Sequence, residues 1–141
     1  MYNIVLIGCG HMGMVHLDDI YTMNNVNIFA VVDTDIERAK KFARKYNADN
    51  FGTDYHKFVA DGKTDIVICA TYPHSHLEIL KECVKYKKHL LCEKPITPDL
   101  ESAKEFIEIV KNSNIKVQTG YILRFNETYR KVAELIQSGI L

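Results

Sequence analysis

The sequence of 141 residues has no excess charge of either sign, because 18 lysines and arginines balance 18 aspartates and glutamates. Its most basic cluster, Lys85, Lys87 and Lys88, stands where a helix is expected to end, and there it complements the helix dipole. We therefore expect no nucleic acid among the partners. No apolar run approaches the roughly 18 residues that span a bilayer, and the N-terminus lacks a basic segment followed by an apolar one. A soluble protein without a secretory signal or a membrane partner is expected.

Cysteine pairs with CxxC spacing are also absent. The four cysteines, Cys9, Cys69, Cys83 and Cys92, are scattered, and three of them lie in strand-like apolar runs, where cysteine behaves as a small hydrophobic residue. This usage indicates a reducing, cytoplasmic compartment. Residues 1–141 contain no repeat, low-complexity tract or linker rich in Pro, Gly and Ser, so they predict one domain. A chain of this length buries roughly 70% of its unfolded surface.

The pattern of the C-terminal residues suggests that the given sequence ends where a further domain begins. A helical pattern from Glu127 to Gln137 is followed by Gly139, a residue that commonly ends helices. Ile140 and Leu141 then resemble the first residues of a strand. We expect a protein that is truncated before a further domain.

Short apolar runs alternate with helical patterns along the chain. The runs are Ile4 to Ile7, Ile28 to Val32, Ile66 to Ala70, Leu90 to Cys92 and Val117 to Tyr121, and Asp49 to Gly52 adds a sixth strand at an edge. Runs that are apolar throughout predict strands buried on both faces of a parallel sheet that helices cover. The pattern predicts an α/β, doubly wound Rossmann fold with strand order 3-2-1-4-5-6. Right-handed crossovers then bring the carboxyl ends of the strands to one rim, where ligands bind.

Two helices show clear sequence signals. Asp35 to Tyr46 has apolar residues at helical spacing. Thr97, Pro98 and Asp99 read as an N-cap, a proline at the first helical position and an acid in the first turn. A helix beginning at Pro98 is therefore expected.

The first strand runs into the stretch GCGHMG, which places Gly8, Gly10 and Gly13 in GxGxxG spacing. In a dinucleotide-binding turn the first glycine permits the tight turn, the second admits a pyrophosphate, and the third allows the helix to pack closely on the strand. The helix N-terminus offers free N–H groups to the phosphates. Asp33 ends the second strand, where a carboxylate accepts the ribose hydroxyls. The combination predicts dinucleotide binding.

The residues around Asp33 bear on which dinucleotide binds. A carboxylate there repels a 2′-phosphate, and the next residue is Thr34 rather than an arginine that would neutralise it. NAD(H) is therefore favoured over NADP(H). Arg38 is able to reach this region, but we interpret it as a solvated helix residue. His11 and Met12, within the glycine loop, and Thr34 complete the contacts predicted at this end of the cofactor.

The fourth strand ends in CATYPHSH, on the same predicted rim as Gly8. Thr71, Tyr72 and His76 are candidates for the wall of the cofactor site. His74 and His76 form an HxH pair that raises the question of a metal ion. Residues two apart on a helix do not share a face, and the sequence shows no third ligand, so no metal is expected.

The fifth strand closes on Glu93, Lys94 and Pro95, an acid and a base in front of a proline. Pro95 restrains Lys94 to extended geometry, which directs its ammonium group off the sheet. Lys94 is the candidate catalytic residue, because an ammonium group there is able to stabilise the alkoxide that forms as hydride leaves, or to protonate a carbonyl in reverse. Glu93 either pairs with Lys94 or binds the nicotinamide ribose. The alternative is an ordinary surface salt bridge, worth about 0–1 kcal/mol.

The motifs together resemble the Gfo/Idh/MocA oxidoreductases, named for glucose-fructose oxidoreductase and inositol dehydrogenase. The resemblance covers the whole chain and rests on GCGHMGMVH (Gly8 to His16), VVDTDIERAKKFARKY (Val31 to Tyr46), ATYPHSH (Ala70 to His76), KKHLLCEKP (Lys87 to Pro95) and GYILRF (Gly120 to Phe125). The EKP motif is far more specific than the glycines. One departure is Tyr72, where many members carry proline.

The resemblance implies the cofactor domain of an NAD(P)-dependent enzyme that oxidises or reduces sugars, cyclitols or related carbonyl compounds. It implies that Lys94 is the catalytic lysine, that Glu93 and Asp33 contact the cofactor, and that Pro95 is a cis proline. Members of the family carry a C-terminal α/β substrate domain, which often forms the contact of a homo-oligomer, and nothing here matches it. This chain is therefore expected to bind cofactor with little or no turnover.

Two other classes of function stay open on the sequence. A noncatalytic dinucleotide sensor would use the same glycine loop, with Lys94 merely paired to Glu93. An S-adenosylmethionine methyltransferase also uses a glycine loop and an acid after the second strand. The GxGxxG spacing and the EKP motif argue against the methyltransferase.

Overall fold

The computed structural model describes residues 1–140 and contains a six-stranded sheet in the order β3-β2-β1-β4-β5-β6. The strands are β1 (Tyr2–Ile7), β2 (Val26–Val32), β3 (Asn50–Gly52), β4 (Ile66–Cys69), β5 (His89–Cys92) and β6 (Val117–Thr119). Every neighbouring pair is parallel. The predicted doubly wound fold and its strand order are confirmed.

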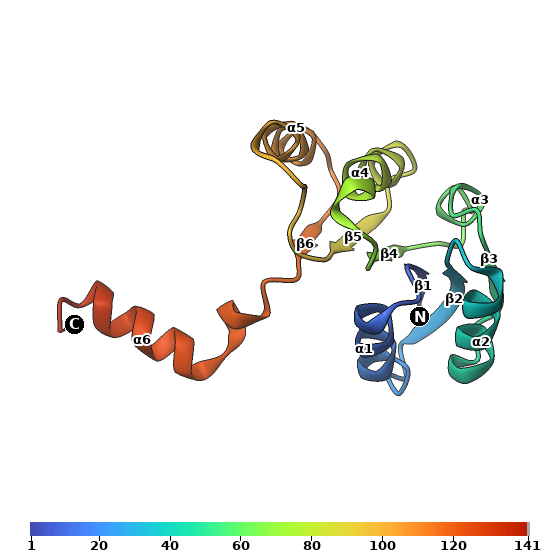
Figure 1. Cartoon of the computed structure of the whole chain (residues 1–141), viewed down its shortest axis with the longest axis horizontal. Helices are drawn as coiled ribbons and strands as arrows, with labels where there is room; N and C mark the ends of the chain where they lie inside the picture. Colours follow the sequence, from blue (N-terminus) through green and yellow to red (C-terminus); the bar gives the residue numbers. More distant parts are fainter. Residues whose placement is uncertain (141) are drawn as a thin grey trace.

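Helices cover both faces of this sheet. The helices are α1 (His11–Ile20), α2 (Ile36–Tyr46), α3 (His56–Val59), α4 (His76–Lys85), α5 (Leu100–Lys111) and α6 (Glu127–Gln137), with short 3-10 turns η1 (Pro73–Ser75) and η2 (Ile122–Phe125). Figure 1 shows α1 and α2 on one side of the strands and α3, α4 and α5 on the other. In the same view α6 extends away from the sheet.

The strands are apolar throughout because each of their faces supports a separate core. On β1, Val5 and Ile7 pack into the core under α3, α4 and α5, whereas Ile4 and Leu6 pack into the core under α1 and α2. All four side chains are at most 4% exposed. Burial on both faces is the reason that the alternating pattern of a half-exposed sheet is missing from the sequence.

The start of α5 corrects one expectation. Thr97 is not the N-cap and Pro98 is not the first helical residue, since α5 begins at Leu100. Asp99 caps the helix instead, with its Oδ1 accepting a hydrogen bond of 2.9 Å from the N–H of Ser102. Thr97 is buried, and its hydroxyl donates to the carbonyl oxygen of Asp99 at 3.0 Å. The helix therefore begins two residues later than predicted.

The last helix, α6, spans Glu127–Gln137 as predicted. A strand was expected to begin at Ile140 and Leu141. The N–H of Ile140 instead donates to the carbonyl oxygen of Leu135 at 3.1 Å, and Leu141 lies outside the described residues. Among residues 1–140, no helix combines the length and the apolar character that crossing a membrane requires.

Candidate functional site

The turn between β1 and α1 is built on two glycines that admit no side chain. Gly8 has a φ of +99°, and a Cβ placed on it would lie 2.5 Å from the carbonyl oxygen of Ala70. A Cβ on Gly13 would lie 2.1 Å from the carbonyl oxygen of Gly8. Since real Cβ atoms do not approach backbone oxygens so closely, these glycines allow the turn and bring α1 tightly against the end of β1.

The middle glycine faces open space. A Cβ on Gly10 would meet no atom within 4 Å, and its φ of −88° suits any residue. Gly10 is also the N-cap of α1, which has no side-chain cap. The first N–H groups of this helix are therefore available to an anion at the turn.

A cavity of about 590 Å³ lies over the carboxyl ends of β1, β2 and β4. Eight residues that the sequence analysis assigned to the cofactor line it: Gly8, Gly10, His11, Met12, Asp33, Thr34, Thr71 and Tyr72. Gly13, His76, Glu93 and Lys94 do not line it. Sequence reasoning missed five lining residues with polar side chains: Arg38, Thr53, Tyr55, His74 and Ser75.

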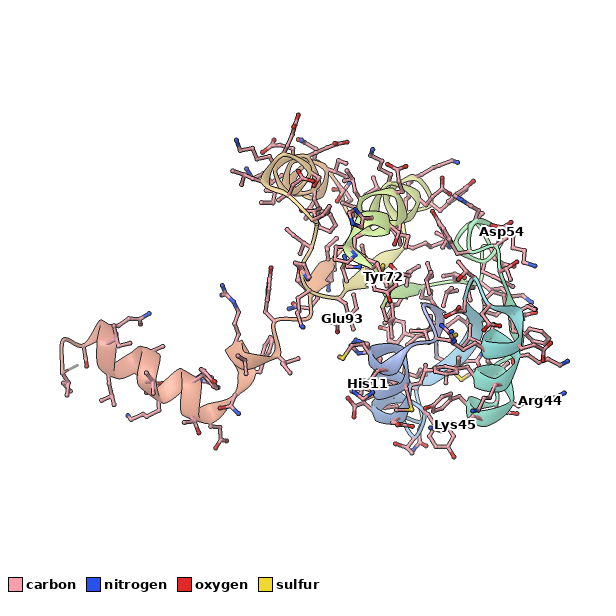
Figure 2. All side chains as sticks on the ribbon, viewed as in Figure 1. His11, Arg44, Lys45, Asp54, Tyr72 and Glu93 are labelled. Carbon is pink, nitrogen blue, oxygen red and sulfur yellow. The ribbon has the colours of Figure 1, made fainter. Side chains whose placement is uncertain are left out.

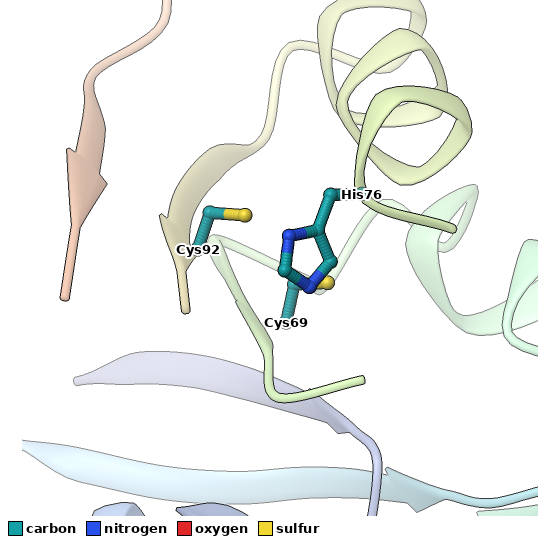
Figure 3. A group of neighbouring side chains, drawn as sticks. All are labelled: Cys69, His76 and Cys92. Carbon is teal, nitrogen blue, oxygen red and sulfur yellow. The ribbon is translucent and has the colours of Figure 1, made fainter. Parts of the chain in front are cut away.

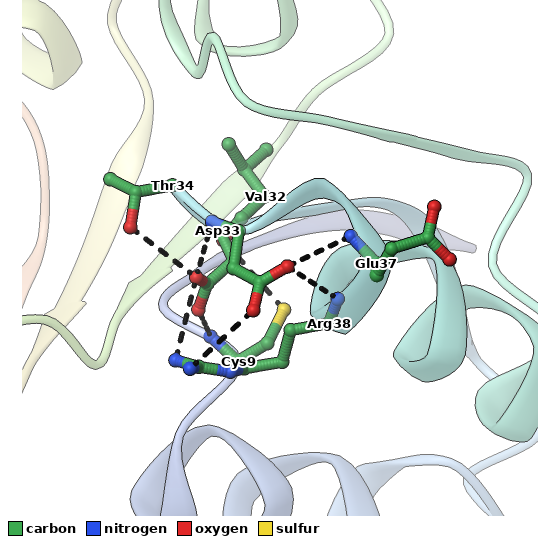
Figure 4. Close-up of polar contacts among 7 residues, drawn as sticks. Cys9, Val32, Asp33, Thr34, Glu37 and Arg38 are labelled. Atoms are coloured by element: carbon green, nitrogen blue, oxygen red, sulfur yellow. Dashed lines mark hydrogen bonds and ion pairs between the residues drawn. The ribbon is translucent and has the colours of Figure 1, made fainter.

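Asp33 joins the ends of β1 and β2 beneath this cavity (Figure 4). Its Oδ2 accepts a hydrogen bond of 2.8 Å from the N–H of Cys9, and its Oδ1 accepts one of 2.9 Å from the N–H of Asp35. The side chain is only 7% exposed. The hydroxyl of Thr34 donates a longer hydrogen bond of 3.5 Å to the same Oδ1. A carboxylate offers about four acceptor positions, so these three bonds leave about one for a ligand hydroxyl. Burial, together with the negative charge of Asp33, raises the pKa of the Cys9 thiol to about 12.

Arg38 is more than a solvated helix residue, which corrects the sequence-based interpretation. One guanidinium nitrogen lies 3.6 Å from Oδ1 of Asp33 and the other lies 3.7 Å from Oδ2 of Asp35. The side chain is half exposed and lines the cavity. Its positive charge is therefore shared between two carboxylates at the cavity edge. Its position one turn into α2, just after the acid, is the signal that would have found it.

We expect Asp33→Ala to weaken NADH binding by about 10- to 100-fold, since hydrogen bonds to a charged group contribute about 1.5–3 kcal/mol. It also leaves the N–H of Cys9 without its acceptor, which destabilises the fold by about 1–3 kcal/mol. Asp99→Ala is the matched control, because it removes a helix-capping carboxylate that does not line the cavity. That variant should lose some stability and keep its affinity. Calorimetric titration with NADH and urea unfolding separate the two effects, and equal affinities for both variants would contradict the role of Asp33.

The segment after β4 forms another wall of the cavity. The hydroxyls of Thr71 and Ser75 lie 2.7 Å apart, and that of Ser75 also donates to the carbonyl oxygen of Tyr72 at 2.9 Å. The side chain of Tyr72 is 85% exposed. Figure 2 shows Tyr72 and His11, which are far apart in the sequence, at the same end of the sheet. This short network fixes the turn that carries the exposed tyrosine.

His74 and His76 diverge, as residues two apart on a helix should. His74 lines the cavity, whereas His76 is fully buried. The ring nitrogens of His76 lie 3.1 Å from the carbonyl oxygens of Pro95 and Thr71. We therefore withdraw the predicted direct contact between His76 and the cofactor. Its ring instead connects the cavity wall after β4 to the loop that carries Lys94.

Two buried thiols accompany His76. The sulfur of Cys69 lies 3.3 Å from the hydroxyl of Thr71, and the thiol of Cys92 donates to the carbonyl oxygen of Glu93 at 3.6 Å. The neighbouring Cys92 thiol, against the effect of burial, lowers the pKa of Cys69. The proximity of Cys69, together with burial, raises the pKa of Cys92. Burial tends to lower the pKa of His76, but its contacts with Cys69 and with the Thr71 carbonyl outweigh burial and raise it. The sequence analysis treated these cysteines only as small apolar residues.

Glu93 pairs with a residue to which the sequence analysis assigned no role. Its Oε1 lies 2.8 Å from Nε2 of His16, and its Oε2 accepts a hydrogen bond of 3.1 Å from the backbone N–H of Lys94. Of the two alternatives for Glu93, the structure contradicts the salt bridge with Lys94, because the carboxylate pairs with His16 instead. Glu93 is 4% exposed, and a Cβ on Gly120 would lie 2.8 Å from its carboxylate. The carboxylate is held between α1, β5 and the end of β6.

Lys94 lies outside the large cavity and beside a second hollow of about 350 Å³. This hollow is lined by Lys94 and by residues 120–124, which include η2. Lys94 is exposed, and its peptide bond to Pro95 is cis, as the family resemblance implied. The candidate catalytic lysine therefore stands at the strand ends, next to the cavity rather than within it.

The glycine turn, the buried acid after β2 and the cavity over the strand ends define a dinucleotide-binding Rossmann domain. Residues 2–121 match the family model described as "Oxidoreductase family, NAD-binding Rossmann fold". The chain belongs to this family, the Gfo/Idh/MocA oxidoreductases, which confirms the resemblance and contradicts the methyltransferase interpretation.

Known relatives agree with this assignment. The chain is 27% identical over 139 residues to a myo-inositol 2-dehydrogenase from Thermotoga maritima, a match that covers 99% of this chain and 42% of the relative. It is 31% identical over 139 residues to an inositol 2-dehydrogenase from Renibacterium salmoninarum, covering 97% and 42%. The crystal structure of a probable dehydrogenase from Thermotoga maritima has a TM-score of 0.87 at 27% identity, covering 97% of this chain and 41% of that chain. The chain thus spans about two fifths of the length of these relatives.

Proposed function

We propose that this chain is the cofactor domain of a dehydrogenase that transfers hydride between NAD(H) and a hydroxyl group of a cyclitol or sugar. The single observation that carries the proposal is the cavity that joins the glycine turn to the buried Asp33. The names of the relatives, inositol 2-dehydrogenases, support a cyclitol substrate. Their greater length supports a second domain that completes the enzyme. A homo-oligomer contact formed by that domain stays a prediction from the family resemblance.

The residues present fit a dinucleotide. The uncapped N-terminus of α1 and the open space at Gly10 suit the pyrophosphate, because free N–H groups and the helix dipole favour an anion. The remaining acceptor position of Asp33 suits a hydroxyl of the adenosine ribose, and a second ribose hydroxyl would replace the long bond from Thr34. Thr71 and Tyr72 form a further wall of the same cavity. When bound, the nicotinamide supplies the hydride acceptor.

We further propose that NAD(H) is preferred to NADP(H). Asp33 is buried and uses both carboxylate oxygens to hold backbone N–H groups, so it cannot easily turn away from a 2′-phosphate. Arg38 is the cation that would offset that phosphate, but Asp33 and Asp35 already share its charge. Repulsion by the carboxylate therefore outweighs attraction by the guanidinium group.

We propose that Lys94 is the general acid or base that acts on the substrate oxygen. Its ammonium group is able to donate a hydrogen bond to the oxygen that becomes negative as hydride leaves, or to protonate a carbonyl oxygen in the reverse direction. The Glu93 carboxylate accepts a hydrogen bond from the backbone N–H of Lys94, and its other oxygen is held by the ring of His16. We assign His16, Glu93 and Gly120 to the positioning of this lysine rather than to direct contact with the substrate.

Calorimetric titration of this chain with NADH and NADPH tests the cofactor proposal. We expect NADH to bind more tightly than NADPH, and Gly10→Ala to weaken NADH binding by at least about tenfold, because a methyl group fills the space reserved for the pyrophosphate. Gly62→Ala is the control, since a Cβ there also meets no atom within 4 Å and Gly62 is outside the cavity lining. Equal loss in both variants, or no binding of either dinucleotide, would contradict the proposal.

A further inference from the structure

Cys69, His76 and Cys92 form a cluster beneath the rim, on the sheet face that α4 covers. Cys69 ends β4 and Cys92 ends β5, and the two are register partners, so their side chains leave the sheet on the same side. His76 is the first residue of α4. Figure 3 shows the two sulfur atoms and the imidazole ring converging from these three elements. The three side chains are fully buried, and their potential ligand atoms all lie within 4.8 Å of one another.

Both ring nitrogens of His76 face carbonyl oxygens, and neither faces a hydrogen-bond donor. Nδ1 lies 3.1 Å from the carbonyl oxygen of Pro95 and 3.2 Å from that of Ile96, and Nε2 lies 3.1 Å from that of Thr71. All three partners are acceptors. A neutral imidazole has one N–H donor and one acceptor nitrogen, so one lone pair faces a carbonyl oxygen in a site that excludes water. These contacts favour a positive charge at the ring, which either a second ring proton or a metal ion supplies, and the two thiols beside it are able to supply the negative charge that a metal ion needs.

We propose that Cys69, His76 and Cys92 bind a thiophilic metal ion, for which Zn²⁺ is the fitting choice. Two thiolates neutralise a divalent ion, which suits a buried site, and the two thiol protons leave to solvent on binding. Thiolate and imidazole donors select Zn²⁺ over Mg²⁺ or Ca²⁺. The sequence could not show this set, because the only histidine pair that it displayed, His74 and His76, does not share a face.

The surroundings of the cluster suit this ion. Nδ1–H donates to the two carbonyl oxygens on the Pro95 side, which fixes the ring and leaves Nε2 for the metal, as backbone carbonyls do for metal-binding histidines. Metal–sulfur and metal–nitrogen distances of about 2.3 and 2.0 Å place tetrahedral ligand atoms about 3.5–3.8 Å apart. Closing from the present spread requires side-chain shifts of about 1 Å or less. Thr71 offers two candidate fourth donors, since its carbonyl oxygen lies 3.1 Å from Nε2 of His76 and its hydroxyl lies 3.3 Å from the sulfur of Cys69.

Cobalt titration of the reduced, metal-free chain tests the site. We expect one equivalent of Co²⁺ to give a sulfur-to-cobalt charge-transfer band and the visible bands of a tetrahedral ion, and Zn²⁺ to displace it. Cys69→Ala and Cys92→Ala should each weaken Co²⁺ binding by at least a hundredfold. Cys83→Ala is the matched control, because Cys83 is equally buried in the same core but lies outside the cluster. Absence of the bands, or equal weakening by all three variants, would overturn the proposal.

X-ray absorption at the zinc edge of the unaltered chain answers the same question and does not depend on the folding of a variant. Two sulfur neighbours at about 2.3 Å and nitrogen or oxygen neighbours at about 2.0–2.2 Å would support the site. Zinc surrounded only by nitrogen and oxygen would place it at exposed histidines and overturn the proposal. A chain that stays metal-free at one equivalent of zinc would also overturn it, and would leave the cluster as an imidazolium hydrogen-bonded among thiols. NADH binding is measured on the same samples, so failure of the metal site remains distinct from failure of the cofactor site.

Discussion

Gly13→Ala is expected to destabilise the chain by about 3 kcal/mol or more, the upper range for overpacking in a fixed core. The added Cβ would lie 2.1 Å from the carbonyl oxygen of Gly8 and 3.3 Å from Leu6. The first obstacle is backbone, so no side-chain rotation relieves it. Helix α1 must move outward, and Leu17, which is fully buried, then loses its packing against the sheet. The urea midpoint and the affinity for NADH should fall together.

Gly10→Ala is the control for Gly13→Ala, because it adds the same methyl group to the same turn where no atom lies within 4 Å. Its unfolding free energy should stay within about 1 kcal/mol of the unaltered chain, while its NADH affinity falls. The two variants therefore distinguish the two roles in the glycine turn: Gly13 is required for packing of α1, and Gly10 leaves space for the ligand. An unchanged urea midpoint for Gly13→Ala would mean that α1 is less tightly held against β1 than the structure shows.

The strands are predictable from the sequence because their apolar runs are covered on both faces. The same criterion places the starts of β1 and β2 too late, since these strands begin at Tyr2 and Val26. The additional residues include Asn3 and Asn27, and the side-chain amide of Asn27 donates to the side-chain oxygen of Asn3 at 2.9 Å. Polar residues begin these strands outside the core, so a prediction based on burial starts each strand two residues too late.

The start of α5 shows a different limit. Thr97 and Asp99 are both residues that favour an N-cap, and local preference does not choose between them. The choice follows from the surroundings, because the hydroxyl of Thr97 is buried and bonded to the carbonyl oxygen of Asp99, whereas the carboxylate of Asp99 is free to accept the N–H of Ser102. Only the packed structure supplies that information.

The adenosine side of the candidate site is predictable because its residues are neighbours in short motifs at strand ends. The contacts around Lys94 are not predictable in this way, because they join residues that are distant in the sequence. His16 and Glu93 are separated by 77 positions, and they meet only because α1 packs beside the end of β5. The cluster of Cys69, His76 and Cys92 likewise requires the register of β4 against β5 and the position of α4. A buried acid at a strand end does indicate that a partner exists, but not which residue it is.

Lys94→Met in the complete enzyme is expected to lower kcat by about 10²–10⁴-fold, the range for loss of a positioned acid or base. Methionine keeps an unbranched side chain of similar length and removes the ammonium group. The affinity for NADH should change little, because Lys94 lies beside the second hollow and not in the cofactor cavity. Steady-state kinetics with inositols, together with NADH titration, measure both quantities. A fall in kcat at unchanged cofactor affinity is the signature of a group that acts on the substrate oxygen.

Lys104→Met is the matched control, since Lys104 is an exposed lysine on α5 outside both cavities. It should retain the activity of the unaltered enzyme. If Lys94→Met retains full kcat as well, then Lys94 is not the proton donor. If instead the unaltered enzyme binds NADH but turns over no polyol, the noncatalytic sensor becomes the better interpretation. The pairing of Glu93 with His16 argues against that outcome, because it holds the backbone of Lys94 while leaving its ammonium group available to a substrate.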